Sequence, residues 1–163
     1  MSKIEAVDES AEMVRRAKKN LREYNTKVNY ICADEYTYLR TAEPYDVITS
    51  SYVLHNFPWS NKRRLTKTIF TKLKPNGHFI LLDKVYPYVS NKRALLLEQQ
   101  KRYTYLPALG YHAIKDHEET DFLPKFRMDE ALTVKLFKDS GFKVVKIVDR
   151  VERDVILFAR KEL

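Results

Sequence analysis

The sequence predicts an α/β fold whose sheet is mostly parallel and ends in an antiparallel pair of strands. Strand-like apolar runs alternate with amphipathic helical segments along most of the 163 residues, and this alternation is typical of parallel strands joined by crossover helices. The last two strand-like runs, 142–148 and 154–160, are separated only by a short charged connection. Such a spacing favours a hairpin. We expect the order β-α-β-β-α-β-α-α-β-β in a single domain over residues 1–163.

The first strand-like run covers residues 3–7, and a helix is expected to begin at Ser10. The Ser10 hydroxyl can cap the helix, and Met13, Ala17 and Leu21 recur at four-residue spacing, which gives the helix one apolar face. This helix is predicted to end near Asn25. The next β-rich run covers residues 28–32.

The middle of the chain predicts a strand over residues 45–50, a helix from Ser60, and a further strand over residues 78–85 that is buried on both faces. The segment 74–77, Lys-Pro-Asn-Gly, predicts a turn between the last two. The basic residues of this region are interpreted as the solvent face of the helix, with a track for a phosphate backbone as the alternative: they are Lys62, Arg63, Arg64, Lys67, Lys72 and Lys74.

Residues 91–125 are expected to form an insert that covers the substrate side, with a helix from 91 to about 106 and a loop over 112–125. Tyr103, Tyr105 and Tyr111 lie in this insert, either as part of a substrate lid or as packing residues. A helix follows over residues 128–140. Gly141 comes directly after it, where a glycine commonly ends a helix.

Five segments, in this order, resemble the class I S-adenosylmethionine-dependent methyltransferases. They match the second strand and its helix, the end of the third strand, the fourth strand and its exit loop, the "LKPGG…D" turn with the fifth strand, and the "AGF" step into the final hairpin: residues 4–13, 32–35, 45–57, 73–83 and 137–142. The resemblance implies a Rossmann-like methyltransferase sheet, mostly parallel, with a C-terminal antiparallel hairpin.

The resemblance also implies S-adenosylmethionine as the cofactor and assigns positions to its contacts: Asp8, Glu9, Met13, Asp34, Glu35 and Ser51. The Asp8 carboxylate would accept hydrogen bonds from the two ribose hydroxyls, and Asp34 would accept one from the adenine amino group. Ser51 would lie beneath the cofactor. Each position has a plain structural alternative, which is a helix cap for Asp8, a turn for Asp34, a loop hydroxyl for Ser51 and core packing for Met13.

His55 is the weak candidate for a catalytic residue, because histidine is the side chain that titrates near neutral pH. No metal site is predicted. The cluster of His112, Asp116, His117, Glu118 and Glu119 has a spacing that matches no recognised metal site, and a solvated loop is the favoured interpretation.

The first strand and helix of this family, with its Gly-x-Gly loop, have no counterpart in the sequence, which contains only three glycines. A fragment, one part of a split enzyme and a shorter sheet all remain open. The flanking strands would then have unpaired edges. Those edges predict a partner chain or a second copy of this chain that completes the sheet.

Residues 91–119 faintly resemble the carboxy-S-adenosylmethionine synthase group, which uses an arginine to hold the extra carboxylate. An ungapped count back from Gly141 places Glu118 at that position. That activity is therefore not carried over to this chain.

The predicted function is methyl transfer from S-adenosylmethionine to a small-molecule acceptor. The alternative is a non-catalytic methyltransferase-like binding module, for which the net charge of +8 suggests RNA. Nucleic acid is not favoured, because the charges are interspersed along the chain. We expect no membrane association, because no apolar run approaches the necessary length. The single Cys32 and the absence of a signal peptide favour the cytoplasm.

Overall fold

The computed structural model describes residues 4–87, 93–94, 97, 101 and 119–162. The chain divides into two compact units, residues 1–43 and residues 44–163. The organisation as a single domain stays a prediction. Most of the expected insert over residues 91–125 lies outside the described residues, although residues 119–121 are helical where a loop was expected.

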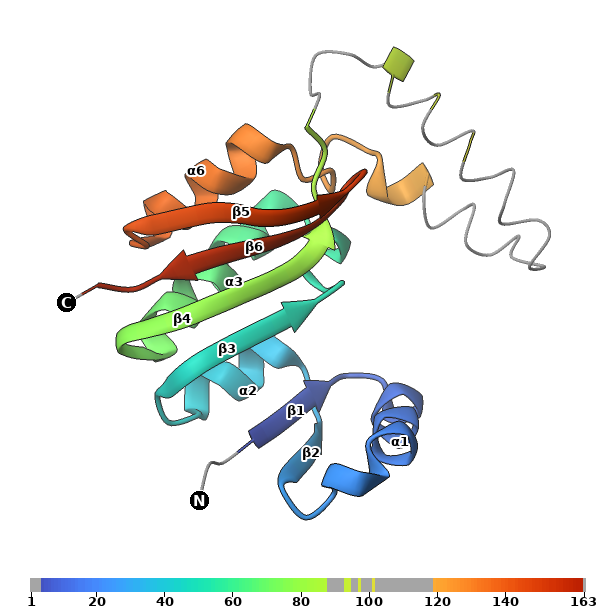
Figure 1. The fold of residues 1–163 in the computed structure, drawn as a ribbon, viewed down its shortest axis with the longest axis vertical. Helices are drawn as coiled ribbons and strands as arrows, with labels where there is room; N and C mark the ends of the chain where they lie inside the picture. The colour runs from blue at the N-terminus through green and yellow to red at the C-terminus, as the bar shows by residue number, and fades with distance from the viewer. Residues whose placement is uncertain (1–3, 88–92, 95–96, 98–100, 102–118, 163) are drawn as a thin grey trace. The chain divides into compact units, whose positions relative to one another are not determined.

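The first unit contains two parallel strands, β1 (Ile4–Asp8) and β2 (Val28–Cys32), whose register runs from Ile4 opposite Val28 to Asp8 opposite Cys32. Helix α1 (Ala11–Asn20) and the short 3₁₀ helix η1 (Arg22–Tyr24) connect the strands, and helix α2 (Glu35–Thr41) follows β2 (Figure 1). The parallel pairing puts the carboxyl ends of β1 and β2 at the same edge.

Side-chain caps begin both helices of this unit. The Ser10 hydroxyl accepts a hydrogen bond from the Met13 amide at 3.3 Å, which confirms the predicted start of α1. Oδ1 of Asp34 accepts one from the Thr37 amide at 2.7 Å and starts α2, a helix that the sequence analysis missed. Helix α1 ends at Asn20 instead of near Asn25, because the chain tightens into η1 there.

The second unit is built on a four-stranded sheet in the order β3-β4-β6-β5, in which β3 and β4 are parallel and the other pairs are antiparallel (Figure 1). The predicted C-terminal hairpin is therefore confirmed. The elements are β3 (Tyr45–Ser51), η2 (Leu54–Asn56), α3 (Trp59–Lys72), β4 (Leu73–Lys84), α6 (Glu130–Ser140), β5 (Val144–Val151) and β6 (Asp154–Arg160). Pairing of the outer sheet edges with another chain stays a prediction.

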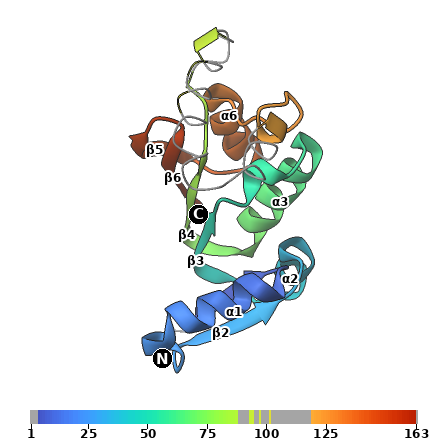
Figure 2. The same ribbon diagram turned by 90° about the vertical axis from the view of Figure 1, so that its right-hand side faces the viewer.

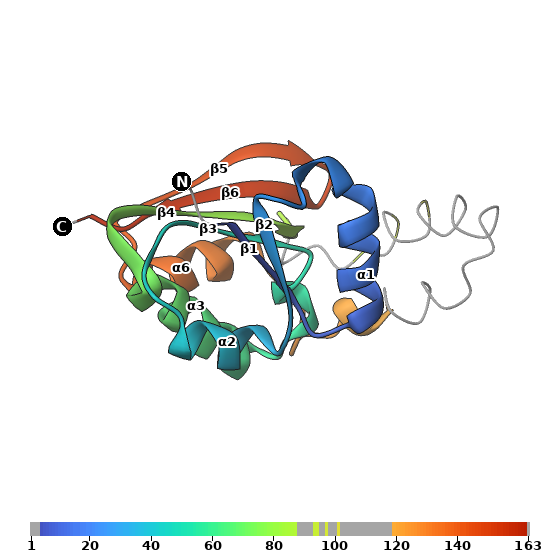
Figure 3. The same ribbon diagram turned by 90° about the horizontal axis from the view of Figure 1, so that it is seen from below.

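Helices α3 and α6 lie on the same face of this sheet (Figure 2), and Figure 3 shows both beneath the strands. Alternate residues of β4 point into the core between sheet and helices. Phe79 and Leu81 are fully buried, whereas Ile80 and Leu82 are half-buried. The expectation that this strand is buried on both faces is therefore wrong. The described helices of this unit cover only the Phe79 face.

Strand β4 continues through residues 74–77, where a turn was expected. The turn chemistry appears instead as an irregularity in the strand. Two steps along β3, from Tyr45 to Val47, match five along β4, from Leu73 to His78. Asn76 takes a positive φ of 60° within this bulge. A Cβ atom at Gly77 would lie 2.9 Å from the Lys74 carbonyl oxygen, so only glycine fits there.

Gly141 ends α6 with a φ of 115°, as the sequence predicted. A Cβ atom at this position would also lie 2.7 Å from the Phe70 ring. The glycine therefore allows the chain to turn into β5 while α6 stays close to α3. Phe79, Phe137 and Phe142 pack nearby, with the rings of Phe79 and Phe137 stacked at 5.4 Å between centroids.

Candidate functional site

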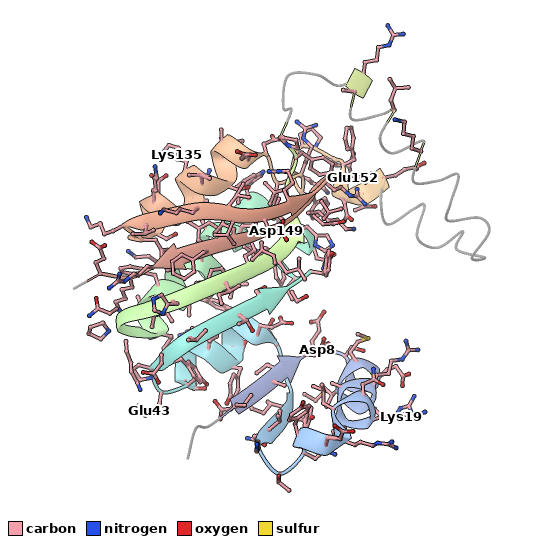
Figure 4. All side chains as sticks on the ribbon, in the orientation of Figure 1. Asp8, Lys19, Glu43, Lys135, Asp149 and Glu152 are labelled. Carbon is pink, nitrogen blue, oxygen red and sulfur yellow. The ribbon has the colours of Figure 1, made fainter. Side chains whose placement is uncertain are left out.

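Four carboxylates gather where β1 and β2 end. Asp8 is the last residue of β1 (Figure 4), and its backbone carbonyl accepts a hydrogen bond from Ala33 at 3.1 Å. Glu9 follows at once, and its carbonyl oxygen lies 3.6 Å from the Cys32 sulfur. Asp34 and Glu35 continue from β2 into α2. The structure thus brings together four of the predicted cofactor residues, because parallel strands present their ends at one edge.

Asp8 has one oxygen engaged within the chain and one that is not. Its Oδ1 atom accepts a hydrogen bond from the Ser10 amide at 2.8 Å, which fixes the orientation of the carboxylate. Its Oδ2 atom accepts no hydrogen bond from the described residues. The helix-cap alternative and the binding hypothesis are therefore compatible, because a carboxylate has acceptor sites for both.

Burial raises the pKa of Glu35 above its usual value, and the neighbouring carboxylates of Glu9, Asp34 and Asp8 raise it further. This coupling shows that the four groups share one electrostatic environment. Such a site favours a ligand that offers hydroxyl or amino donors, or positive charge, and disfavours an anion.

The other two predicted cofactor residues come from other elements, Met13 from α1 and Ser51 from β3 in the second unit. The Met13 side chain on α1 is 49% exposed, so it is not a core residue of the first unit. Ser51 is the exposed last residue of β3 in the second unit. The next residue, Tyr52, has a positive φ of 54°, and its amide bonds to the Leu82 carbonyl at 2.8 Å. The chain therefore turns sharply away from the strand at this point.

His55 lies in η2 and is held by a buried aspartate. Its Nδ1 atom is 2.6 Å from Oδ1 of Asp83, and its backbone amide donates to Oδ2 of the same residue at 3.3 Å. A carboxylate can only accept, so we assign the imidazole proton to Nδ1. The Nε2 atom then carries the free lone pair. The side chains of His55 and Asp83 are 7% and 0% exposed.

A second aspartate lies on the other side of the imidazole. Oδ2 of Asp121 is 3.8 Å from Nε2 of His55 and 2.6 Å from Nζ of Lys84. Sequence reasoning missed both aspartates as site residues. Asp83 shares the inward alternation of Phe79 and Leu81 along β4, a signal that could have found it. Asp121 stood in an expected loop, and the sequence carried no signal for it.

Lys62 is the main correction to the sequence analysis. It was placed on the solvent face of its helix, but its side chain is completely buried. Its Nζ atom donates to the carbonyl oxygens of Phe57, of Phe126 at 2.9 Å and of His55 at 3.4 Å. Burial lowers the pKa of this ammonium group to about 8, although Asp83 and Asp121 oppose the shift.

Several sequence-based interpretations concern residues that the structure does not describe. Tyr103, Tyr105 and Tyr111 are among them, as are four members of the His112–Glu119 cluster. The described part of the chain contains no group of histidine, cysteine or acidic side chains able to hold a metal ion. It also contains no helix long and apolar enough to cross a membrane.

Comparisons with known proteins agree on one family. A family model for a methyltransferase domain matches residues 1–77. A carboxy-S-adenosyl-L-methionine synthase from Nautilia profundicola is 25% identical over 148 residues, 88% of this chain and 61% of the relative. One from Shewanella frigidimarina is 28% identical over 138 residues, 80% of this chain and 53% of the relative. The chain thus spans less than two thirds of either relative.

Solved structures support the fold. An O-methyltransferase family protein from Burkholderia thailandensis has a TM-score of 0.68 at 13% identity, with 98% of this chain and 43% of that chain covered. Human N-acetylserotonin methyltransferase, solved with S-adenosylmethionine, has a TM-score of 0.63 at 16% identity, with 99% and 41% covered. At these identities the likenesses show the fold alone. The family model and the curated relatives do not favour the alternative of a non-catalytic binding module.

Proposed function

Since the chain belongs to the class I S-adenosylmethionine-dependent methyltransferase family, we propose that it takes part in methyl transfer from S-adenosylmethionine to a small-molecule acceptor. The observation that carries this proposal is the group of four carboxylates at the ends of β1 and β2. When bound, this cofactor supplies an electrophilic methyl group on a positively charged sulfur.

The residues of the first unit fit the adenosine part of this cofactor. Adenosine offers two ribose hydroxyls and one amino group as donors, and Oδ2 of Asp8 has acceptor capacity that no described residue uses. Asp8 would hold the ribose and Asp34 the adenine amino group, with Glu9 and Glu35 adding acceptors and negative charge. The exposed Met13 side chain is available as an apolar contact on the neighbouring helix. Ser51, in the second unit, keeps its proposed role as a cofactor contact.

His55 is our candidate for the residue that takes the acceptor's proton. An oxygen or nitrogen nucleophile loses a proton as it gains a methyl group, so a base near its donor atom helps. The hydrogen bond from Nδ1 to Asp83 leaves Nε2 as the basic atom and stabilises the imidazolium that forms. Asp121, paired with Lys84, adds negative charge on the Nε2 side. Positioning and alignment of the reactants would supply the rest of the rate enhancement.

The acceptor is proposed to be a small molecule, as is usual for this family. The single Cys32 supports a reducing compartment as the place of the reaction, and we propose the cytoplasm. The synthesis of carboxy-S-adenosyl-L-methionine named for the two relatives is not proposed for this chain, because the arginine expected to hold the carboxylate has no match at Glu118.

Calorimetry with the full-length natural protein tests cofactor binding. We expect saturable binding of S-adenosylmethionine and of S-adenosylhomocysteine at one site per chain, and no heat with ATP, whose phosphates the carboxylates would repel. Binding of ATP in place of both sulfur compounds, or no binding of any of the three, would contradict the proposal.

A further inference from the structure

The least expected group in the second unit is the buried ammonium of Lys62. Removing a charge from water is costly unless hydrogen bonds and opposite charges replace the lost hydration. Three backbone carbonyls meet its three N–H donors, those of His55, Phe57 and Phe126. The Trp59 ring lies 5.6 Å from the same atom. All three donors of the ammonium therefore have a partner.

The three carbonyls come from two segments that are distant in the sequence. His55 and Phe57 belong to η2 and its end, whereas Phe126 closes a turn in which its amide donates to the Leu123 carbonyl at 2.8 Å. This turn follows Asp121 along the chain. Lys62 thus joins the segment that carries His55 to the segment that carries Asp121, whose carboxylate lies on the Nε2 side of the imidazole.

We propose that Lys62 is a positioning residue, whose ammonium group fixes the backbone on either side of His55 and so keeps the imidazole bonded to Asp83. This inference rests on the proposed role of His55 as the base. Lys62 itself bonds only to backbone carbonyls among the described residues, so it acts through His55. A hydrocarbon side chain of similar length could fill the same space, but it would leave the three carbonyls without this donor.

The three hydrogen bonds from Lys62 require its protonated form. A neutral amine has two N–H donors for the same three carbonyls, so loss of the proton removes one of the bonds. The charged groups that face this site are Asp83 on β4 and Asp121 before the Phe126 turn, and both favour the ammonium form. The titratable imidazole of His55 lies between these two carboxylates. Above a pH of about 8, the hydrogen bonding of Lys62 to the backbone of η2 should therefore weaken.

The test compares Lys62→Met with Lys67→Met in the full-length protein. Lys67 is on the same helix, but its Nζ atom donates to the Ser140 carbonyl at 3.3 Å, away from His55. The readout is the proton NMR signal of His55 Nδ1–H, assigned by its loss in His55→Gln. We expect this proton to exchange with water about tenfold faster in Lys62→Met, the effect of losing about one hydrogen bond. It should be unchanged in Lys67→Met.

A second measurement uses the unaltered protein, so its result does not depend on whether Lys62→Met folds. In the unaltered protein, exchange of the Nδ1 proton should accelerate between pH 7 and 9 by more than the tenfold per pH unit of simple base catalysis. Lys67→Met should show the same excess. Normal exchange in a folded Lys62→Met protein, or no excess acceleration in the unaltered protein, would overturn the proposal.

The NMR measurements keep this inference separate from the proposed function. If the protein transfers no methyl group, the exchange data still decide whether Lys62 holds His55. If it does transfer one, Lys62→Met should lower kcat and leave KM for S-adenosylmethionine unchanged, because the described hydrogen bonds of the lysine go only to backbone carbonyls of the second unit, whereas the proposed adenosine contacts belong to the first. An equal loss in KM and kcat would indicate general structural damage instead.

Discussion

The imidazole of His55 and the carboxylate of Asp83 form a buried pair, with Nδ1 2.6 Å from Oδ1. Asp83 also accepts the backbone amides of His55 and of Lys84, the latter at 2.8 Å. Three donors therefore converge on one carboxylate inside the second unit. Two of them bond to Oδ1 and the third bonds to Oδ2, so both oxygens of the carboxylate are in use.

Replacement of Asp83 by asparagine should damage both stability and the proposed reaction. The amide has only one acceptor oxygen, and its NH₂ group would face a donor. Losing hydrogen bonds to a buried charged group costs roughly 3 kcal/mol of unfolding free energy. Urea unfolding checks that loss, and single-turnover methyl transfer should fall in rate with little change in cofactor affinity.

Asp46→Asn is the matched control, because it removes an aspartate whose side chain is 81% exposed in an ion pair with Lys74. Its unfolding free energy and transfer rate should match those of the unaltered protein. An unchanged rate in Asp83→Asn would show that the buried pair is only structural.

Replacement of Asp8 by asparagine should weaken binding of S-adenosylmethionine. The amide oxygen can still accept from Ser10, so the local structure should persist, but the second acceptor becomes a donor that faces the ribose hydroxyls. Loss of a hydrogen bond to a charged group corresponds to about a tenfold or larger increase in Kd. Calorimetry measures it, with Asp46→Asn again as the control. A normal Kd would remove Asp8 from the proposed site.

Glu35 makes the stability of the first unit depend on pH. Its pKa is raised above 4.5, so the folded protein holds the proton more tightly than the unfolded chain does. The contribution of Glu35 to stability is therefore fully present below pH 4.5 and is lost as pH rises through the raised pKa. Glu35→Gln should abolish this loss. Thermal unfolding at pH 4 and pH 7 should show the variant gaining stability, relative to the unaltered protein, at the higher pH.

Lys62 makes the stability of the second unit depend on pH with the opposite sign. Its pKa falls from 10.5 to about 8 on folding, so between these values the unfolded chain holds a proton that the folded protein has released. Stability from this group therefore rises with pH across that window. The difference in unfolding free energy between the unaltered protein and Lys62→Met should shift in favour of the unaltered protein from pH 8 to pH 10. A constant difference would mean that Lys62 keeps an ordinary pKa.

Loss of the Lys62 proton has two separate effects, one on the stability of the whole fold and one on the local restraint of His55. Release of the proton relieves the cost of a buried charge, which stabilises the fold, while it removes one of the three bonds to the carbonyls near His55. Greater global stability and weaker local restraint can therefore occur together above pH 8. Unfolding measures the first effect, and exchange of the His55 proton measures the second.

The sequence by itself determined the succession of strands along the chain, the C-terminal hairpin and the position of Asp8 and Asp34. These features depend on local signals: hydrophobic alternation, a serine cap, a glycine at the end of α6, and acidic residues directly after apolar runs. Local signals fail where a long-range pairing overrides them. The turn residues 74–77 became a bulge within β4, because residues before and after them pair with β3 and so extend the strand.

Only the tertiary structure decided which side chains surround His55. Asp83 is 28 residues away in the sequence, and Phe126 is 64 residues from Lys62. No periodic pattern connects such positions. Lys62 shows the reason most clearly, because a lysine on a helix is interpreted as solvated unless its surroundings are known. Burial is a property of the packed assembly, and three carbonyls with two carboxylates make a charged side chain stable where the sequence predicts water.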